Sequence, residues 1–117
     1  MLRVGSTVLG VSDMRRAAEF WCRALGYVPR DEIEERFTVL APPDGVGQNV
    51  SLMVSETPVQ EKPRVHLDLY ASDPAEEIDR LVNLGASIVD WTDYPPDRDF
   101  TVLADTEGNR FCVIDKS

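Results

Sequence analysis

Two stretches of the chain place apolar residues at the spacing of an amphipathic helix. The first, SDMRRAAEFWCRALG, can begin at a cap formed by Ser12 or Asp13 and can end at Gly26, where glycine tolerates the left-handed conformation. Its apolar residues fall on one helical face, namely Met14, Ala17, Ala18, Trp21, Ala24 and Leu25. The pattern therefore predicts a helix directly after residue 13.

The second helical stretch is SDPAEEIDRLVNLG. Asp73 is its predicted cap, Pro74 takes the first helical position, and Glu76 completes a capping-box spacing. Its predicted buried stripe consists of Ala75, Ile78, Leu81 and Val82, and Gly85 ends it.

Short extended runs surround both helices. The segments 3–11 and 64–70 precede them, and in the latter Val65, Leu67 and Leu69 alternate with His66, Asp68 and Tyr70. This period of two predicts a strand with one buried face. Further strands are predicted after the helices, at YVPRDEI, RFTVLA and NVSLMVS in the first half and at ASIVDW, DFTVLA and RFCVID in the second.

The same pentapeptide, FTVLA, occurs at 37–41 and again at 100–104. Other landmarks recur at offsets of 59 to 61 residues, including Ser12-Asp13 with Ser72-Asp73 and Asn49 with Asn109. Landmarks at a nearly constant offset indicate two copies of strand–helix–strand–strand–strand. We therefore expect an α+β protein of tandem βαβββ modules, residues 1–55 and 64–117, joined by the linker 56–63 within one domain, 1–117.

Composition and charge narrow the class of protein. The 117 residues are 43% hydrophobic, as in ordinary globular domains, and no apolar run is long enough to span a membrane. The net charge of −9 disfavours nucleic-acid and anionic-membrane partners. With two cysteines and no predicted signal peptide, we expect a cytoplasmic protein with reduced thiols.

The segments 11–27, 65–86 and 100–114, and the turn DTEGN within the last, resemble the vicinal oxygen chelate superfamily. This superfamily includes glyoxalases, bleomycin-resistance proteins and extradiol dioxygenases. The resemblance implies a curled mixed sheet around a central cavity, with the helices outside. It also implies a homodimer and, in the metal enzymes of the family, four ligands on the cavity side.

The resemblance places those four ligand positions at Ser6, Leu52, His66 and Cys112. Leucine cannot bind a metal and a neutral serine is a poor ligand, so only His66 and Cys112 remain as candidates. Asp68 could add an oxygen, since it shares a strand face with His66. We therefore expect no catalytic metal and no other cofactor.

The only histidine, His66, is also the main candidate for acid–base catalysis. Asp68 could orient its ring and raise its basicity, although a lone histidine on a strand is more often structural. Cys112, between apolar neighbours, is expected to be an inert buried thiol rather than a nucleophile.

A cavity of this fold would bind a small molecule through apolar walls and a few polar groups. We expect its lining to contain Ser6, Val8, Leu52, His66, Asp68, Tyr70 and Cys112. The aspartate-rich loop 90–99 adds Trp91 and Tyr94, which could stack on an aromatic or cationic ligand.

Three functions remain open at this point. The favoured one is a metal-independent small-molecule binding or sequestering protein. The second is a lyase, isomerase or dioxygenase that uses an atypical metal site or acid–base chemistry through His66. The third is an interaction module that has lost its pocket.

Overall fold

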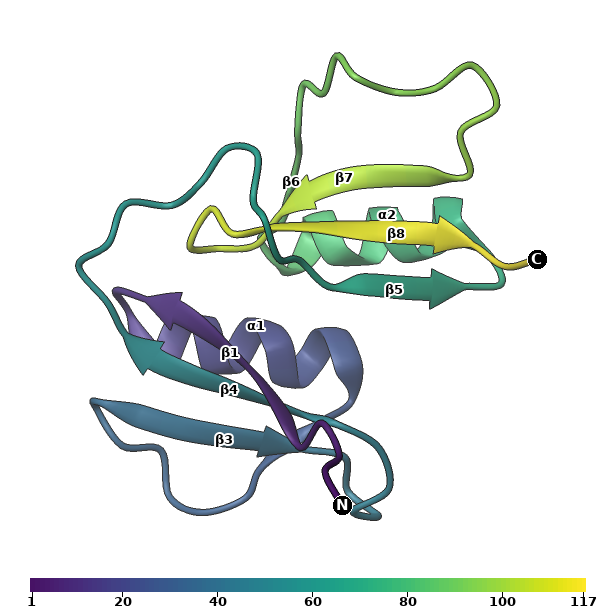
Figure 1. Ribbon diagram of the computed structural model, residues 1–117. Coiled ribbons are helices and arrows are strands. Elements are labelled where there is room, and N and C mark those ends of the chain that lie inside the picture. The colour runs from purple at the N-terminus through teal and green to yellow at the C-terminus, as the bar shows by residue number, and fades with distance from the viewer. The chain divides into compact units, whose positions relative to one another are not determined.

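The computed structural model describes all residues, 1–117, and its helices and strands form two copies of one order (Figure 1). The first copy contains β1 (Ser6–Val11), α1 (Met14–Leu25), β2 (Val28–Pro29), β3 (Phe37–Ala41) and β4 (Asn49–Val54). The second contains β5 (Asp68–Ala71), α2 (Pro74–Leu84), β6 (Ser87–Ile88), β7 (Phe100–Ala104) and β8 (Arg110–Asp115). The α+β class and the doubled βαβββ order are confirmed.

The eight strands form two open four-stranded sheets, one in each copy. The order is β1-β4-β3-β2 in the first sheet and β5-β8-β7-β6 in the second. In both, the first strand pairs in parallel with the last, and the remaining pairs are antiparallel. The two copies thus share their topology as well as their sequence landmarks, as expected of a duplication.

The chain divides into two compact units, Met1–Pro58 and Val59–Ser117. The second half of the expected linker belongs to the second unit rather than to a free connection. Val59 lies beside Gly108, and the Lys62 ammonium pairs with the Asp93 carboxylate at 2.7 Å.

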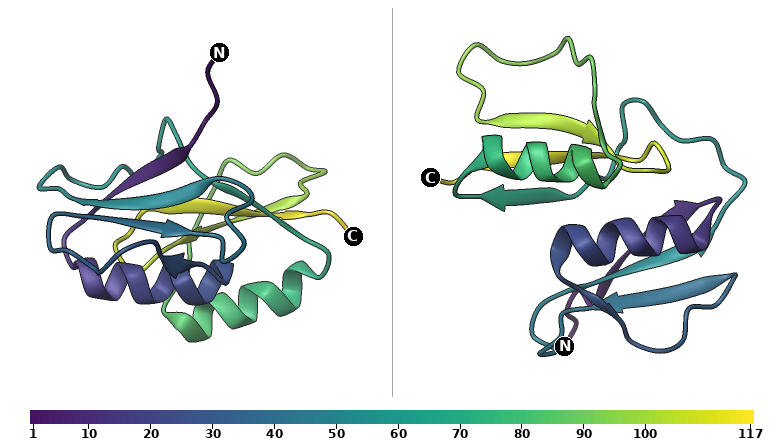
Figure 2. Two further views of the ribbon diagram at one scale, coloured as in Figure 1. Left: turned by 90° about the horizontal axis from the view of Figure 1, so that it is seen from below. Right: turned by 180° about the vertical axis from the view of Figure 1, so that it is seen from behind.

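In the first unit, α1 covers one face of the sheet, as Figure 2 shows. Asp13, and not Ser12, caps the helix: its carboxylate accepts a hydrogen bond from the Arg16 amide at 3.1 Å. Gly26 ends the helix at φ 70°, as its position predicts. The buried side is centred on Trp21 and Phe20, whose rings meet edge to face 5.1 Å apart.

In the second unit, Asp73 caps α2 through the Glu76 amide, and Pro74 lies in its first turn. The predicted buried stripe is only partly correct. Leu81 is buried, whereas Ala75 and Val82 are exposed. Neither helix in the structure is long and apolar enough to cross a membrane.

Several strands are shorter than the sequence predicts. The first strand of each unit begins at Ser6 and at Asp68, so the predicted starts at 3 and 64 are wrong. Val65, predicted to be buried, is 79% exposed, because it precedes the paired part of its strand. β2 keeps only two residues, and its Pro29 has no amide hydrogen to continue a ladder.

Gly85, the residue that ends α2, allows a test of the backbone geometry at the end of this helix. Gly85 has φ 121°, and a Cβ there would lie 2.9 Å from Thr106 Cγ2. We expect Gly85→Ala to lower the free energy of unfolding by about 1–3 kcal/mol in urea denaturation. Gly5→Ala is the control, because Gly5 has open space around its Cα and no positive φ. Equal stability of the two variants would contradict the strained geometry at residue 85.

Candidate functional site

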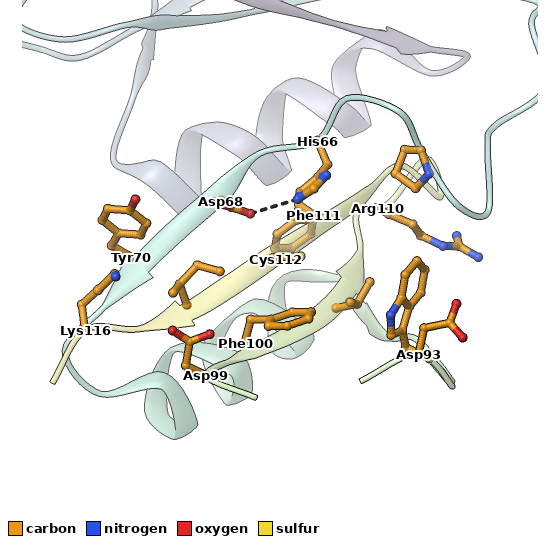
Figure 3. A pocket seen from close by; sticks show the side chains of 14 residues that line it. His66, Asp68, Tyr70, Asp93, Asp99, Phe100, Arg110, Phe111, Cys112 and Lys116 are labelled. Carbon is orange, nitrogen blue, oxygen red and sulfur yellow. Dashed lines mark ion pairs between the residues drawn. The ribbon is translucent and has the colours of Figure 1, made fainter. Parts of the chain in front are cut away.

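The second unit contains a cavity of about 550 Å³ on the face of its sheet opposite α2 (Figure 3). Its lining combines aromatic and aliphatic walls with charged groups from β5, β7, β8 and the preceding loops. These residues are Pro63, His66, Asp68, Tyr70, Trp91, Asp93, Asp99, Phe100, Val102, Arg110, Phe111, Cys112, Ile114 and Lys116.

Strand alternation places these side chains. Asp68 pairs in register with Cys112, and Val102 pairs with Cys112 from the other side, so all three share one face. Residues two positions along from Cys112, Arg110 and Ile114, share that face as well. Their neighbours Phe111 and Val113 are buried.

A close pair of side chains, His66 and Asp68, lies in this cavity. His66 Nε2 lies 3.0 Å from Asp68 Oδ1, and the two side chains are 40% and 50% exposed. The Cys112 amide donates to the Leu67 carbonyl at 2.9 Å, which ties the residue between them to β8. The strand edge therefore holds the pair in place while leaving it accessible. The structure brings together the two residues that the sequence nominates for acid–base chemistry.

Cys112 adds a third group to this cluster. One ligand atom from each of His66, Asp68 and Cys112 lies within 4.8 Å of the others. Desolvation, and secondly the negative charge of Asp68, raises the pKa of the Cys112 thiol from 9.0 to about 11. Near neutral pH the sulfur is therefore a protonated thiol and not a nucleophile.

This pKa can be tested by alkylation in a Cys22→Ser variant, which leaves Cys112 as the only thiol. At pH 8 we expect the folded protein to react with iodoacetamide about 100-fold more slowly than an ordinary thiol, with a midpoint near pH 11. Because the pKa of the Cys112 thiol is higher in the folded than in the unfolded state, the protonated thiol contributes stability to the folded protein below pH 9. This contribution is lost as the pH rises toward 11. A midpoint of 9 or below in the folded state would contradict the buried environment.

The donor set does not fit the metal site that the fold family uses. The Cys112 thiol would have to lose its proton, and His66 Nε2 would have to leave Asp68. In the first unit, the Ser6 hydroxyl is bonded to the Ser51 hydroxyl at 2.6 Å, and Leu52 carries no donor atom. One imidazole, one carboxylate and one neutral thiol are a poor match for a hard Lewis-acid cation.

The structure does not bring Leu52 to the face on which the sequence predicts it. Leu52 is fully buried and pairs with Leu9, whereas Ser51 pairs with Val8 and is bonded to Ser6. The counterpart of Cys112 is thus Ser51, because Val39 pairs with Ser51 just as Val102 pairs with Cys112. The predicted position, three residues after Asn49, is one residue too far along β4. A shift of one residue moves a side chain to the opposite face of the sheet.

Ser6 and Val8 do share one face of the first sheet. Val8 is 48% exposed there, and Ser6 is held by its bond to Ser51. Neither belongs to the lining of the cavity described above, which the second unit forms by itself.

The aspartate-rich loop 90–99 places only one of its two predicted aromatic residues in the cavity. Trp91 lines the cavity, but Tyr94 does not. The Tyr94 hydroxyl accepts a hydrogen bond from the Val102 amide at 2.8 Å, and its ring packs 5.3 Å from that of Phe100. The Arg98 guanidinium lies 3.9 Å from the ring centroid and already covers the ring. Tyr94 therefore anchors the loop to β7.

Sequence reasoning missed the charged ends of the cavity. Tyr70 is 72% exposed, and the Lys116 ammonium lies 5.0 Å from its ring centroid. Arg110 donates from Nη1 to the Gly108 carbonyl at 2.8 Å, while its buried Nε has no partner. The period of two that leads from Cys112 back to Arg110 and forward to Ile114 and Lys116 was the signal that could have identified them.

The model of the glyoxalase-like domain family matches residues 6–114. The chain belongs to this family. No curated protein sequence matches this glyoxalase-like chain.

Solved structures agree on the fold of this glyoxalase-like protein. A fosfomycin resistance protein from Listeria monocytogenes has a TM-score of 0.77 at 12% identity, over 100% of this chain and 93% of its own. A glyoxalase-related enzyme from Fulvimarina pelagi has a TM-score of 0.71 at 17% identity, over 99% and 89%. A member of the glyoxalase/bleomycin resistance protein/dioxygenase superfamily from Sphaerobacter thermophilus has a TM-score of 0.68 at 25% identity, over 99% and 98%. The chain therefore has the vicinal oxygen chelate fold.

Proposed function

We propose that this glyoxalase-like protein binds a small, flat organic molecule in the cavity of its second unit, without a catalytic metal. The observation that carries the proposal is the cavity itself, whose 550 Å³ falls within the size range of small-molecule sites. Trp91, Phe100 and Val102 supply apolar wall, and His66, Asp68 and Arg110 supply the few polar groups that orient a ligand.

The charge of the second unit narrows the class of ligand. Residues 59–117 contain thirteen acidic and six basic side chains, so most of the protein's negative charge lies in the unit that holds the cavity. A field of this sign repels anions and attracts cations. The favoured ligand is therefore an aromatic molecule that is neutral or positively charged.

The binding part of the proposal is tested with an aromatic probe of each kind, neutral 2-hydroxy-1-phenylethanone and cationic benzylammonium. Saturation-transfer NMR should show both bound, and Trp91→Ala should weaken binding about 5- to 10-fold through loss of ring contact. Asp79→Asn, an exposed change on α2, is the matched control and should bind like the wild type. If neither probe binds at millimolar concentration, the proposed function is wrong.

The metal-free part is tested by titrating Zn²⁺, Ni²⁺ and Mn²⁺ into protein dialysed against a chelator. We expect no one-to-one binding by calorimetry and no rise in melting temperature, because a metal would have to displace the thiol proton of Cys112 and break the close contact between His66 and Asp68. Tight one-to-one binding that disappears in His66→Gln would overturn the metal-free reading.

A further inference from the structure

We propose that Arg110 binds a carboxylate group of the ligand, so that the cavity of the second unit takes an aromatic zwitterion. A ligand of this class carries one carboxylate and one ammonium group and is neutral overall. This inference rests on the proposed function, because it takes the ligand to lie in the same cavity. It goes further by naming the residue that orients the ligand and the chemical group that this residue recognises.

The first support is that the Arg110 guanidinium has no negatively charged partner. Arg110 lines the cavity, and its side chain donates only from Nη1 to the Gly108 carbonyl at 2.8 Å, which is a neutral acceptor. Its Nε is buried without an acceptor, and no carboxylate pairs with the group. A guanidinium that is partly removed from water and lacks a counter-charge is stabilised by an anion that a ligand brings.

The second support is that the nearby carboxylates of the cavity already have other partners. The Asp93 carboxylate pairs with the Lys62 ammonium at 2.7 Å. Asp68 Oδ1 lies 3.0 Å from His66 Nε2. Neither acid therefore neutralises Arg110, and the position of its counter-ion is left for a ligand.

The third support is the place of Arg110 relative to Lys116, the other basic side chain of the lining. Arg110 is the first residue of β8 and Lys116 follows the last, and Figure 3 shows them at opposite ends of the cavity. The Lys116 ammonium already lies 5.0 Å from the centroid of the Tyr70 ring. A guanidinium also presents parallel N–H donors that match the two oxygens of a carboxylate, which an ammonium does not. The carboxylate is therefore assigned to the Arg110 end.

The turn before β8 holds Arg110 in position. The Asp105 carboxylate accepts from the Asn109 amide at 2.9 Å, and the Gly108 amide donates to the Asp105 carbonyl at 3.0 Å. Because Arg110 Nη1 bonds to the Gly108 carbonyl, the guanidinium is attached to this turn. A donor that is already oriented loses less conformational entropy on binding than a freely rotating side chain.

The ammonium group of the ligand follows from the charge around the cavity. The second unit has thirteen acidic and six basic side chains, so it repels a simple anion at long range. The lining itself contains three carboxylates and two basic side chains. A ligand whose ammonium offsets its carboxylate avoids this repulsion and still meets Arg110. Its ring would lie against the apolar wall that contains Trp91 and Phe100.

The test compares three probes that share one aromatic ring. They are zwitterionic 4-(aminomethyl)benzoate, anionic 4-methylbenzoate and cationic 4-methylbenzylammonium, and their affinities are measured by NMR titration of the protein. For the wild type we expect the zwitterion to bind at least about 5-fold more tightly than either of the other two.

Arg110→Met removes the guanidinium and keeps an apolar side chain. We expect it to weaken binding of the two probes that carry a carboxylate by about 10- to 100-fold, and to leave the affinity for 4-methylbenzylammonium unreduced. A purely structural role of Arg110 would instead weaken all three probes equally. Arg110→Lys keeps the charge without the parallel donors, so it should recover only part of the loss.

Arg80→Met is the matched control. Arg80 lies on α2 outside the cavity and pairs with Glu77 at 2.8 Å, so this variant should bind all three probes like the wild type. Melting temperatures show whether each variant is folded. If Arg110→Met does not fold, Arg110→Lys provides the same comparison of the three probes.

The outcomes separate the two proposals. Equal losses for all three probes in the Arg110 variants overturn the role of Arg110 and leave the binding function standing. A loss of carboxylate binding in Lys116→Met but not in Arg110→Met places the anion at the other end and also overturns it. A zwitterion that binds no more tightly than the cation overturns the ligand class. Failure of every aromatic probe to bind overturns the binding function, and this inference with it.

Discussion

Replacing Leu52 with alanine is expected to lower the free energy of unfolding by about 2–5 kcal/mol, because a fully buried leucine leaves a cavity when it is truncated. Leu52 lies on β4, on the face that packs against α1, with Leu9 and Thr38 as its strand partners. Urea denaturation monitored by circular dichroism measures the change.

Val8→Ala is the matched control for this variant. Val8 pairs with Ser51, the residue next to Leu52, but it is on the opposite face and is 48% exposed. We expect this substitution to cost less than about 1 kcal/mol, because nearly half of that residue's surface is already exposed to solvent. If Leu52→Ala were as mild as Val8→Ala, the assignment of the two faces of the first sheet would be wrong.

Replacing Asp105 with alanine is expected to destabilise the second unit by about 2–4 kcal/mol. The Asp105 carboxylate is 4% exposed and accepts hydrogen bonds from the Glu107 and Asn109 amides, each at 2.9 Å. Hydrogen bonds to a buried charged group are among the stronger ones, and their loss leaves amides of the turn unsatisfied.

Asp105→Asn keeps an oxygen in the same place, so it is expected to recover at least half of the lost stability in the same denaturation experiment. Asp115→Ala is the second control, because its exposed carboxylate accepts only from the Ser117 amide at the chain end.

The turn that Asp105 holds contains Gly108 and leads into Arg110, so Asp105→Ala should also weaken binding of the probes. Wild-type stability of Asp105→Ala would show that the backbone alone forms this turn.

The helices and their ends were predictable because their signals are local. The caps at Asp13 and Asp73 and the glycines that end both helices are determined by a few consecutive residues. The repeat was equally accessible, since two copies of FTVLA and the flanking landmarks need only the order of residues along the chain.

The predicted buried stripe of α2 shows that local sequence signals do not determine which residues are buried. Ala75 and Val82 are apolar at helical spacing, yet they are exposed, because burial depends on what a helix packs against rather than on its own pattern. The lengths of β2 and β6 were likewise unpredictable from their residues, since a strand ends where its partner's hydrogen bonds end.

In the candidate site, too, some features follow from the local sequence and others only from the tertiary structure. The amino-acid sequence by itself determined the doubled module, the helix limits and the pairing of His66 with Asp68, because these follow from periodicities within short segments. Only the tertiary structure decided that Ser51 and not Leu52 corresponds to Cys112, that Tyr94 anchors a loop, and that Arg110 and Lys116 line the cavity. Which strand faces which neighbour, and in what register, is a property of pairing between distant segments, and a shift of one residue reverses every side chain.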